Sequence, residues 1–183
     1  KAARKVMEWL DAILFALVAV YFINTFFFQN YKIPSSSLEK TLLVGDFLFV
    51  SKFHYGARVP NTPLAMPFVH HTIPIINTKS YVEWIKLPYK TLPGFQTVKR
   101  NDMVVFNFPA GDTVVLENQG PSYYDLVRND AYQYQIDYSS ARQRMWENPA
   151  YHVAARPVDK RENYIKRCVA VAGDKLEIKD GVL

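Results

Sequence analysis

Residues 9–28 read WLDAILFALVAVYFINTFFF, and this stretch decides the fold class of the chain. In an α-helix, twenty residues rise about 30 Å, which is the thickness of the hydrocarbon core of a bilayer. Trp9 lies at one end of the run, and Tyr21 with a cluster of phenylalanines lies toward the other, as in the aromatic belts of membrane proteins. The run therefore predicts a transmembrane helix.

Basic residues before the run indicate its orientation: Lys1, Arg4 and Lys5. By the positive-inside rule, we expect residues 1–30 to form a cytoplasmic N-terminus and a single anchor in the cell membrane, with residues 31–183 on its outer side. A cleavable signal peptide is disfavoured because no small-x-small site follows the run. A buried core helix is disfavoured because the run is apolar all round, although Asp11 must reach interfacial water.

The composition fits one modest folded domain behind this anchor. The chain has 183 residues, of which 49% are hydrophobic, 15% aromatic and 21% charged, so it is not a disordered chain. A net charge of +5 is too diffuse to indicate nucleic-acid binding. Cys168 is the lone cysteine, and none of the four histidines has the spacing of a helical zinc site. We therefore expect no cofactor, no metal and no nucleic acid.

Strand signals dominate the rest of the chain. DFLFVSKF (46–53), MVVFNF (103–108) and YIKRCVAV (164–171) are short, apolar and bounded by turn residues. A turn at 172–174 followed by 175–178 predicts a hairpin, and Val182 with Leu183 resembles the start of a further strand. The expected fold is mainly β: a transmembrane helix followed by an antiparallel β-sheet domain with long insertions.

Two long connections separate these strands. Six prolines within residues 57–99 argue against long helices there. Residues 110–163 are polar and rich in tyrosine; Ser122 with Asp125 forms a capping-box pattern, and 139–148 predicts a short helix. Tyrosines among arginines could stack on nucleic-acid bases, but an ordinary solvated surface is the favoured interpretation.

Two features have the potential for chemistry. Three consecutive serines, 35–37, follow the span, although such a string is usually a plain turn. On the strand from Tyr164, alternate residues share a face that is apolar or aromatic apart from Lys166. Desolvation there would lower the pKa of the lysine, whose neutral amine can accept a serine proton. The alternative, in which Lys166 extends to solvent, stays open from the residues alone.

Three segments, in this order, resemble boxes of the bacterial type I signal peptidases. They read IPSSSLEKTLLVGDFLFVSKF from residue 33, RNDMVVFNFP from residue 100 and YIKRCVAVAGDKLEI from residue 164. The resemblance implies a membrane-bound serine endopeptidase that removes signal peptides from secretory preproteins after small-x-small sites. It implies Ser37 as nucleophile, Lys166 as general base, and the Ser35 hydroxyl with the Ser37 N–H as oxyanion hole.

The same resemblance implies a shallow pocket that accepts small side chains, with these lining residues: Tyr31, Ile33, Pro34, Leu38, Leu42, Leu48, Tyr164 and Ile165. A further set matches positions with mainly structural roles: Asp46, Lys52, Arg100, Asp102, Arg167, Gly173 and Asp174. The chain departs from the family pattern in having Leu38 after the nucleophile instead of methionine, and Lys40 where proline is usual. The family's last box is not found before Leu183, so we expect the sequence to be a fragment.

Two other functions compete with this interpretation. Ser37 to Lys40 matches S-x-x-K, the nucleophile motif of penicillin-binding proteins, but no S-D-N or K-T-G follows. A non-catalytic, membrane-anchored β-domain or adaptor is the alternative from outside the enzymes.

Overall fold

A computed structural model describes residues 2–76, 78–118 and 120–181. The chain forms two compact units. The first comprises Lys1–Pro60, Leu87–Phe106 and Asn163–Leu183, and the second comprises Asn61–Lys86 and Asn107–Glu162. Both contain small antiparallel sheets of two strands, so the prediction of a mainly β fold behind an apolar helix is confirmed.

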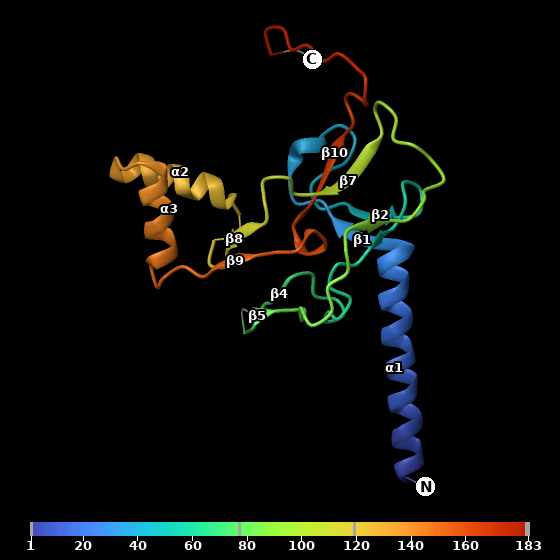
Figure 1. Cartoon of the computed structure of the whole chain (residues 1–183). Helices are drawn as coiled ribbons and strands as arrows, with labels where there is room; N and C mark the ends of the chain where they lie inside the picture. The colour runs from blue at the N-terminus through green and yellow to red at the C-terminus, as the bar shows by residue number, and fades with distance from the viewer. Residues whose placement is uncertain (1, 77, 119, 182–183) are drawn as a thin grey trace. The chain divides into compact units, whose positions relative to one another are not determined.

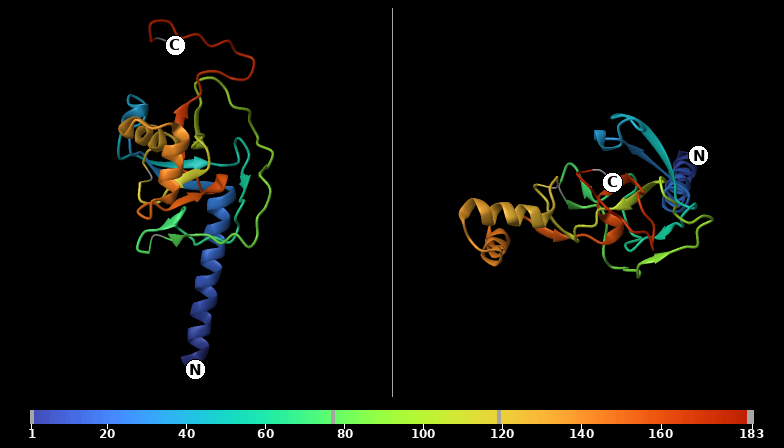
Figure 2. Two further views of the ribbon diagram at one scale, coloured as in Figure 1. Left: turned by 60° about the vertical axis from the view of Figure 1, so that its left-hand side comes forward. Right: turned by 90° about the horizontal axis from the view of Figure 1, so that it is seen from above.

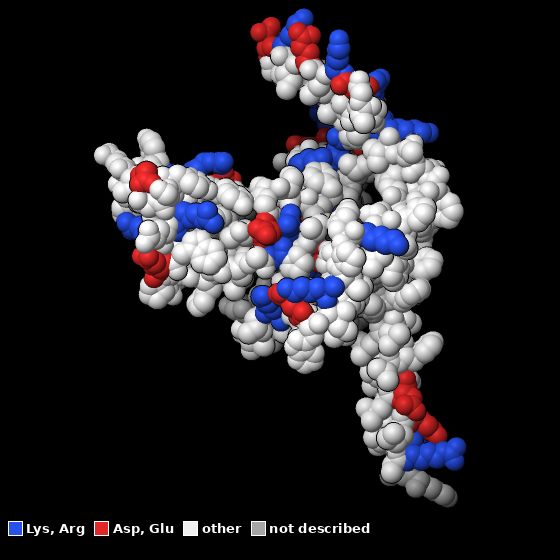
Figure 3. Space-filling view, viewed as in Figure 1, with Lys and Arg blue, Asp and Glu red and all other residues white. Residues whose placement is uncertain are grey.

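The first unit begins with helix α1, Ala2–Phe26. Residues Ala3–Phe26 have a mean hydropathy of 2.0, so the helix is long and apolar enough to cross a membrane. None of its most apolar stretch is buried inside the protein. Figure 1 shows it as a long rod, and on the face in Figure 3 its charged side chains gather near the N-terminal end. It ends two residues earlier than the apolar run, because Phe28 starts a strand opposite Ser51 and packs edge-on against Phe53.

Strands β1 (Phe28–Lys32) and β2 (Phe47–Ser51) form the hairpin that follows α1, which confirms the strand predicted at 46–53. Its two faces differ. Side chains including Tyr31 and Leu48 lie half-buried on one face, whereas Phe47 and Phe49 are exposed on the other. The short pair β3 (Arg58–Val59) and β6 (Lys90–Thr91) lies in the same unit.

Strands β7 (Met103–Asn107) and β10 (Asn163–Arg167) pair with each other, although a long insertion separates them in sequence. The backbone N–H of Cys168 donates to the carbonyl of Asp102 over 2.8 Å, and that of Asn101 donates back to Cys168 over 2.7 Å. Both strands overlap the segments predicted from the sequence, 103–108 and 164–171. The second strand, β10, is shorter than the segment predicted for it.

The hairpin predicted over 164–178 is wrong. The turn forms, with the N–H of Asp174 donating to the carbonyl of Val171 over 3.0 Å. Residues 175–178 are exposed and form no strand, because a hairpin arm without a buried apolar face is only marginally stable. The strand start predicted at Val182 and Leu183 lies outside the described residues.

The second unit contains two further strand pairs and two helices. β4 (Thr72–Ile73) pairs with β5 (Thr78–Lys79), and β8 (Thr113–Val115) pairs with β9 (Val153–Ala155). Helices α2 (Tyr123–Tyr134) and α3 (Tyr138–Glu147) pack on each other, as both Figure 1 and Figure 2 show, and a 3₁₀ turn follows at Val158–Lys160. Their core consists of Val115, Tyr123, Val127, Ala141 and Met145.

Sequence patterns located both helix starts. Ser122 caps α2 by accepting from the N–H of Asp125 over 3.1 Å, which confirms the N-cap of the predicted capping box, and its hydroxyl donates to the Asp125 carboxylate over 2.6 Å. The predicted helix at 139–148 is α3, capped by Asp137. No helix occurs in the described parts of 57–99, as the prolines predicted.

Candidate active site

The serine triplet forms a tight turn on the outside of the first unit. Ser35 has an extended backbone, and Ser36–Leu38 form a single 3₁₀ turn closed by the N–H of Glu39 on the carbonyl of Ser36. The side chain of Leu38 is buried, whereas that of Ser37 is exposed. The Ser35 and Ser37 hydroxyl oxygens lie 3.5 Å apart. The buried leucine fixes the turn, so the Ser37 hydroxyl is presented to solvent.

Backbone hydrogen bonds close the loop that carries this turn. Ile33 donates to the carbonyl of Asp46 and accepts from the N–H of Gly45, each over 2.9 Å. The Asp46 carboxylate accepts from the N–H of Leu43 over 2.8 Å. The side chain of Ile33 is buried below this closure. The two ends of the loop are therefore held together, and a carboxylate satisfies one of its otherwise unpaired N–H groups.

Lys40 has a left-handed backbone, with φ of 79°. Proline fixes φ near −65°, so a proline could not adopt this conformation. Leu38 continues the turn, since its carbonyl accepts from the N–H groups of both Thr41 and Leu42. Where the chain has lysine in place of the usual proline, the backbone after Ser37 therefore follows a path that only a non-proline residue allows.

Lys166 lies on β10, the strand that contacts the serine turn. Cα atoms of β10 lie within 8 Å of Cα atoms of the 3₁₀ turn, and Figure 1 shows that turn, in light blue, beside the strand. The side chain of Lys166 is half-buried, as are those of its neighbours Tyr164 and Ile165. The candidate base is thus partly removed from water, next to the segment that carries the candidate nucleophile.

A polar contact joins the same two segments. Arg167 donates to the Thr41 hydroxyl over 2.7 Å and to the carbonyl of Asn101 over 3.0 Å. Asp102 follows Asn101 in the sequence. Its carboxylate accepts from the N–H of Lys99 and from the hydroxyl of Tyr55, and these bonds lower the pKa of the carboxyl group. The Arg167 side chain therefore connects β10 to the loop after Ser37 and to the residue before Asp102, where the chain enters β7.

Comparison with known proteins places the chain in a family. The sequence model described as signal peptidase, peptidase S26 matches residues 6–183. The chain belongs to the peptidase S26 family. No solved structure matched it.

Curated relatives from several bacteria carry the name signal peptidase I. The chain is 43% identical over 53 residues to that of Haemophilus influenzae, 30% over 112 residues to that of Buchnera aphidicola from Baizongia pistaciae, and 30% over 136 residues to that of Helicobacter pylori strain J99. These matches cover 29%, 61% and 62% of the chain. They cover only 15%, 28% and 38% of the relatives' own lengths.

The residues that the sequence predicts as pocket lining all belong to the first unit. Tyr31 and Leu48 are direct partners across β1 and β2, and both are half-buried. Burial raises the pKa of Tyr31 to about 12, although the positive charge of Arg58 acts in the opposite direction and lowers this pKa. Ile33 and Leu38 are buried, while Leu42, Tyr164 and Ile165 are half-buried and Pro34 is exposed.

The two candidate catalytic side chains lie on elements that contact each other, β10 and the 3₁₀ turn. Among the described residues no hydrogen bond joins Ser37 to Lys166, and the partner of the Ser37 hydroxyl is Ser35. No group of three metal-ligating side chains occurs in the parts of the chain that the structure describes. Sequence reasoning missed Thr41 and Asn101 as anchors of Arg167, because a long-range bond to an ordinary threonine or a backbone carbonyl leaves no sequence pattern.

Proposed function

We propose that this protein is a membrane-bound signal peptidase that uses Ser37 and Lys166 as a catalytic pair. The observation that carries the proposal is the contact between β10 and the serine turn, in a member of the S26 family with an apolar helix directly before that turn. A lysine on a flexible four-carbon stem can reach groups on a neighbouring segment. Catalytic hydrogen bonds of this type often tighten only when substrate is bound.

In the first step, the Ser37 hydroxyl oxygen attacks the carbonyl carbon of the scissile peptide bond. Neutral Lys166 accepts the hydroxyl proton, and a tetrahedral oxyanion forms. The C–N bond then breaks, and the proton on Lys166 passes to the leaving amine. The products are a mature protein with a free N-terminus and a signal peptide esterified to Ser37.

In the second step, water attacks the ester carbonyl while Lys166 accepts one of its protons. Collapse of the second tetrahedral intermediate breaks the ester bond and returns the proton to Ser37. The amine is neutral again, and the enzyme is regenerated. Lys166 therefore acts twice as a base and twice as an acid, without a histidine.

The Ser35 hydroxyl and the Ser37 backbone N–H are proposed to stabilise the oxyanion. Supporting this role, the two serine hydroxyls lie 3.5 Å apart on one exposed turn. One such donor typically lowers the barrier by about 3 kcal/mol. Small residues before the cleavage site would bind the apolar surface near Ile33, Leu38 and Ile165, where larger side chains would clash.

We further propose that α1 spans the cell membrane once, with residues 1–30 cytoplasmic or within the bilayer and residues 31–183 on the outer side. Lys1, Arg4 and Lys5 precede the apolar stretch, which supports this orientation. The serine turn and the substrate are then both held at the outer surface of the membrane, which raises their effective concentration. The partners are signal peptides of secretory preproteins and the bilayer itself.

The test uses the chain in liposomes with a preprotein reporter that carries one Ala-x-Ala site. Ser37→Ala and Lys166→Ala should each abolish cleavage, whereas Ser36→Ala, the exposed serine between the two active positions, should cleave normally. Full cleavage by Lys166→Ala would reject the dyad. No cleavage by the wild-type chain would favour the alternative of a non-catalytic, membrane-anchored β-domain.

A further inference from the structure

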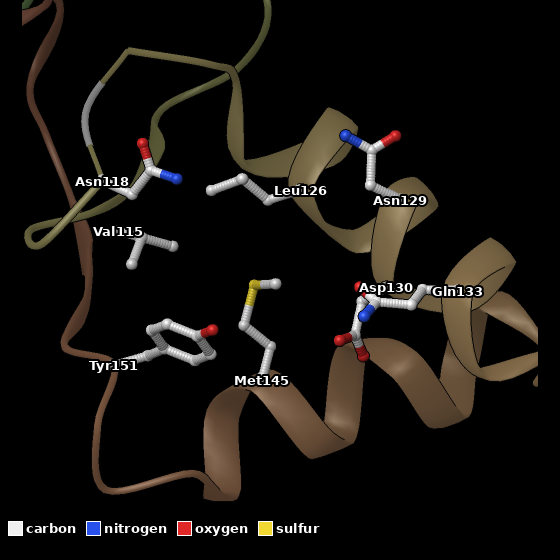
Figure 4. Close-up of a pocket in the computed structure, with 8 residues that line it drawn as sticks. All are labelled: Val115, Asn118, Leu126, Asn129, Asp130, Gln133, Met145 and Tyr151. Atoms are coloured by element: carbon white, nitrogen blue, oxygen red, sulfur yellow. The ribbon is translucent and has the colours of Figure 1, made fainter.

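The insertion between β7 and β10 contains a pocket that the peptidase chemistry does not use. It is a hollow of about 150 Å³ within the second unit, between α2, α3 and the segment after β8. Its apolar lining is Val115, Leu126 and Met145, and its polar lining includes Asn118, Asp130 and Tyr151 (Figure 4). An engineered apolar cavity of about this volume holds benzene, so the hollow suits a ligand of about six heavy atoms.

Asp130 gives this pocket its chemical character. Only 19% of its side chain is exposed, and its Oδ2 atom is buried with no hydrogen-bond donor among the described residues. A buried carboxylate oxygen without a donor is costly, and native structures rarely leave one unsatisfied. The pocket therefore lacks one donor, and a positively charged one would be favoured most.

Arg144 does not supply that donor. Its Nε atom is 3.8 Å from Asp130 Oδ2, which is beyond hydrogen-bond range. Its guanidinium lies over the ring of Tyr134, 3.5 Å from the ring centre, and the stacking holds it there. Arg144 lowers the local negative potential, yet the carboxylate keeps its capacity to accept a bond.

We propose that this pocket binds an alkylammonium group, with the methylene chain against Met145 and Leu126 and the ammonium on Asp130. An apolar wall with one carboxylate among its polar lining residues matches a lysine-like chain, whose head is a compact point charge. The Tyr151 ring adds a face that attracts cations.

The source of the ammonium is either a lysine side chain of a polypeptide or a free polyamine. This inference does not rest on the proposed cleavage reaction, because every residue of the pocket belongs to the Asn107–Glu162 segment of the second unit. Its failure would leave the proposed peptidase unaffected.

The test follows the ¹³C-methyl NMR signal of Met145 in the full chain, assigned with Met145→Leu. Three probes are titrated: Nα-acetyl-lysine methylamide, cadaverine and Nα-acetyl-norleucine methylamide, which keeps the stem but lacks the charge. We expect saturable shifts of the Met145 signal with either or both ammonium probes, and at least about tenfold weaker binding of norleucine. If the lysine amide binds more tightly, the ligand is a lysine side chain of a polypeptide. If cadaverine binds more tightly, the ligand is a free polyamine.

Asp130→Asn should weaken ammonium binding by about tenfold or more, whereas Glu147→Gln, an exposed carboxylate on α3, should not. Should Asp130→Asn fail to fold, the comparison of lysine with norleucine on the wild-type chain still decides. Equal binding of the two, an unmoved Met145 signal, or wild-type affinity in folded Asp130→Asn would overturn the proposal.

Discussion

The Arg167 guanidinium donates a 2.7 Å hydrogen bond to the Thr41 hydroxyl, and this bond joins β10 to the segment that follows the Ser37 turn. Lys166 directly precedes Arg167, so the bond positions the strand that carries the candidate base relative to the candidate nucleophile. We therefore predict that Arg167 acts as a positioning residue, and that its effect on catalysis is seen in kcat.

Thr41→Val removes the hydroxyl and keeps the side-chain shape. We expect kcat for an Ala-x-Ala peptide to fall by about ten- to a hundredfold with KM unchanged, because small displacements of a reacting group have effects of this size. In an Arg167→Gln background, Thr41→Val should have no further effect. Additive losses in the double variant would show that the bond does not position the base.

Ser35→Ala tests the oxyanion donor. Loss of one such donor should lower kcat by about 10²–10³-fold with little change in KM, because the ground-state complex has no oxyanion for the donor to stabilise. Ser35→Thr should restore part of the rate, and Ser36→Ala serves as the matched control. An unchanged kcat in Ser35→Ala would remove Ser35 from the mechanism.

Lys40→Gly should raise the thermal stability of the chain. A left-handed conformation costs a non-glycine residue about 1–2 kcal/mol, while the added freedom of glycine in the unfolded state costs about 0.4–1 kcal/mol. The net gain is therefore at most about 1.5 kcal/mol. The same change at neighbouring Glu39, where φ is −50°, should destabilise. Melting curves in detergent that rank Lys40→Gly below wild type would contradict the assigned backbone.

The Arg100–Asp174 pair predicts a pH dependence of stability. The Arg100 side chain donates to Asp174 over 2.7 Å, and with the N–H of Val171 it lowers the pKa of that carboxyl from 3.8 to about 2. Because the folded-state pKa is depressed, the contribution is complete above pH 3.8 and is lost as the pH falls through about 2.

Melting temperatures of wild type and Asp174→Asn should therefore differ by a constant amount from neutral pH down to about pH 5 and converge below pH 3.8. Asp180→Asn, which changes an exposed carboxyl near the C-terminal end of the described chain, is the control. A difference that persists unchanged to pH 2 would mean that the pair does not couple ionisation to folding.

Strong local patterns in the sequence were sufficient for much of this fold. The twenty-residue apolar run predicted helix α1, and Ser122 with Asp125 predicted the start of α2, because length, hydropathy and capping act within a few residues. The strands β8 and β9 were not foreseen, since three residues each are too few to show a period. Their pairing is fixed by tertiary packing around Val115.

The sequence likewise predicted some residues of the candidate site and not others. Ser37 and Lys166 were found through the boxes in which they lie, whereas Thr41 was missed because its bond to Arg167 depends on folding between distant segments. The hairpin at 164–178 was wrong because its Gly-Asp turn forms without a second arm, and Asp174 pairs with Arg100 instead. Turn chemistry predicts a turn, but strand pairing needs an apolar face to bury.

The most direct measurement is acid-quenched mass spectrometry of the full chain after mixing with an Ala-x-Ala ester, whose good leaving group makes deacylation the slow step. The account predicts an acyl adduct on the peptide that contains Ser37, formed rapidly by the wild type and absent in Lys166→Ala. An adduct on another residue, or equally rapid acylation of Ser37 without Lys166, would contradict it.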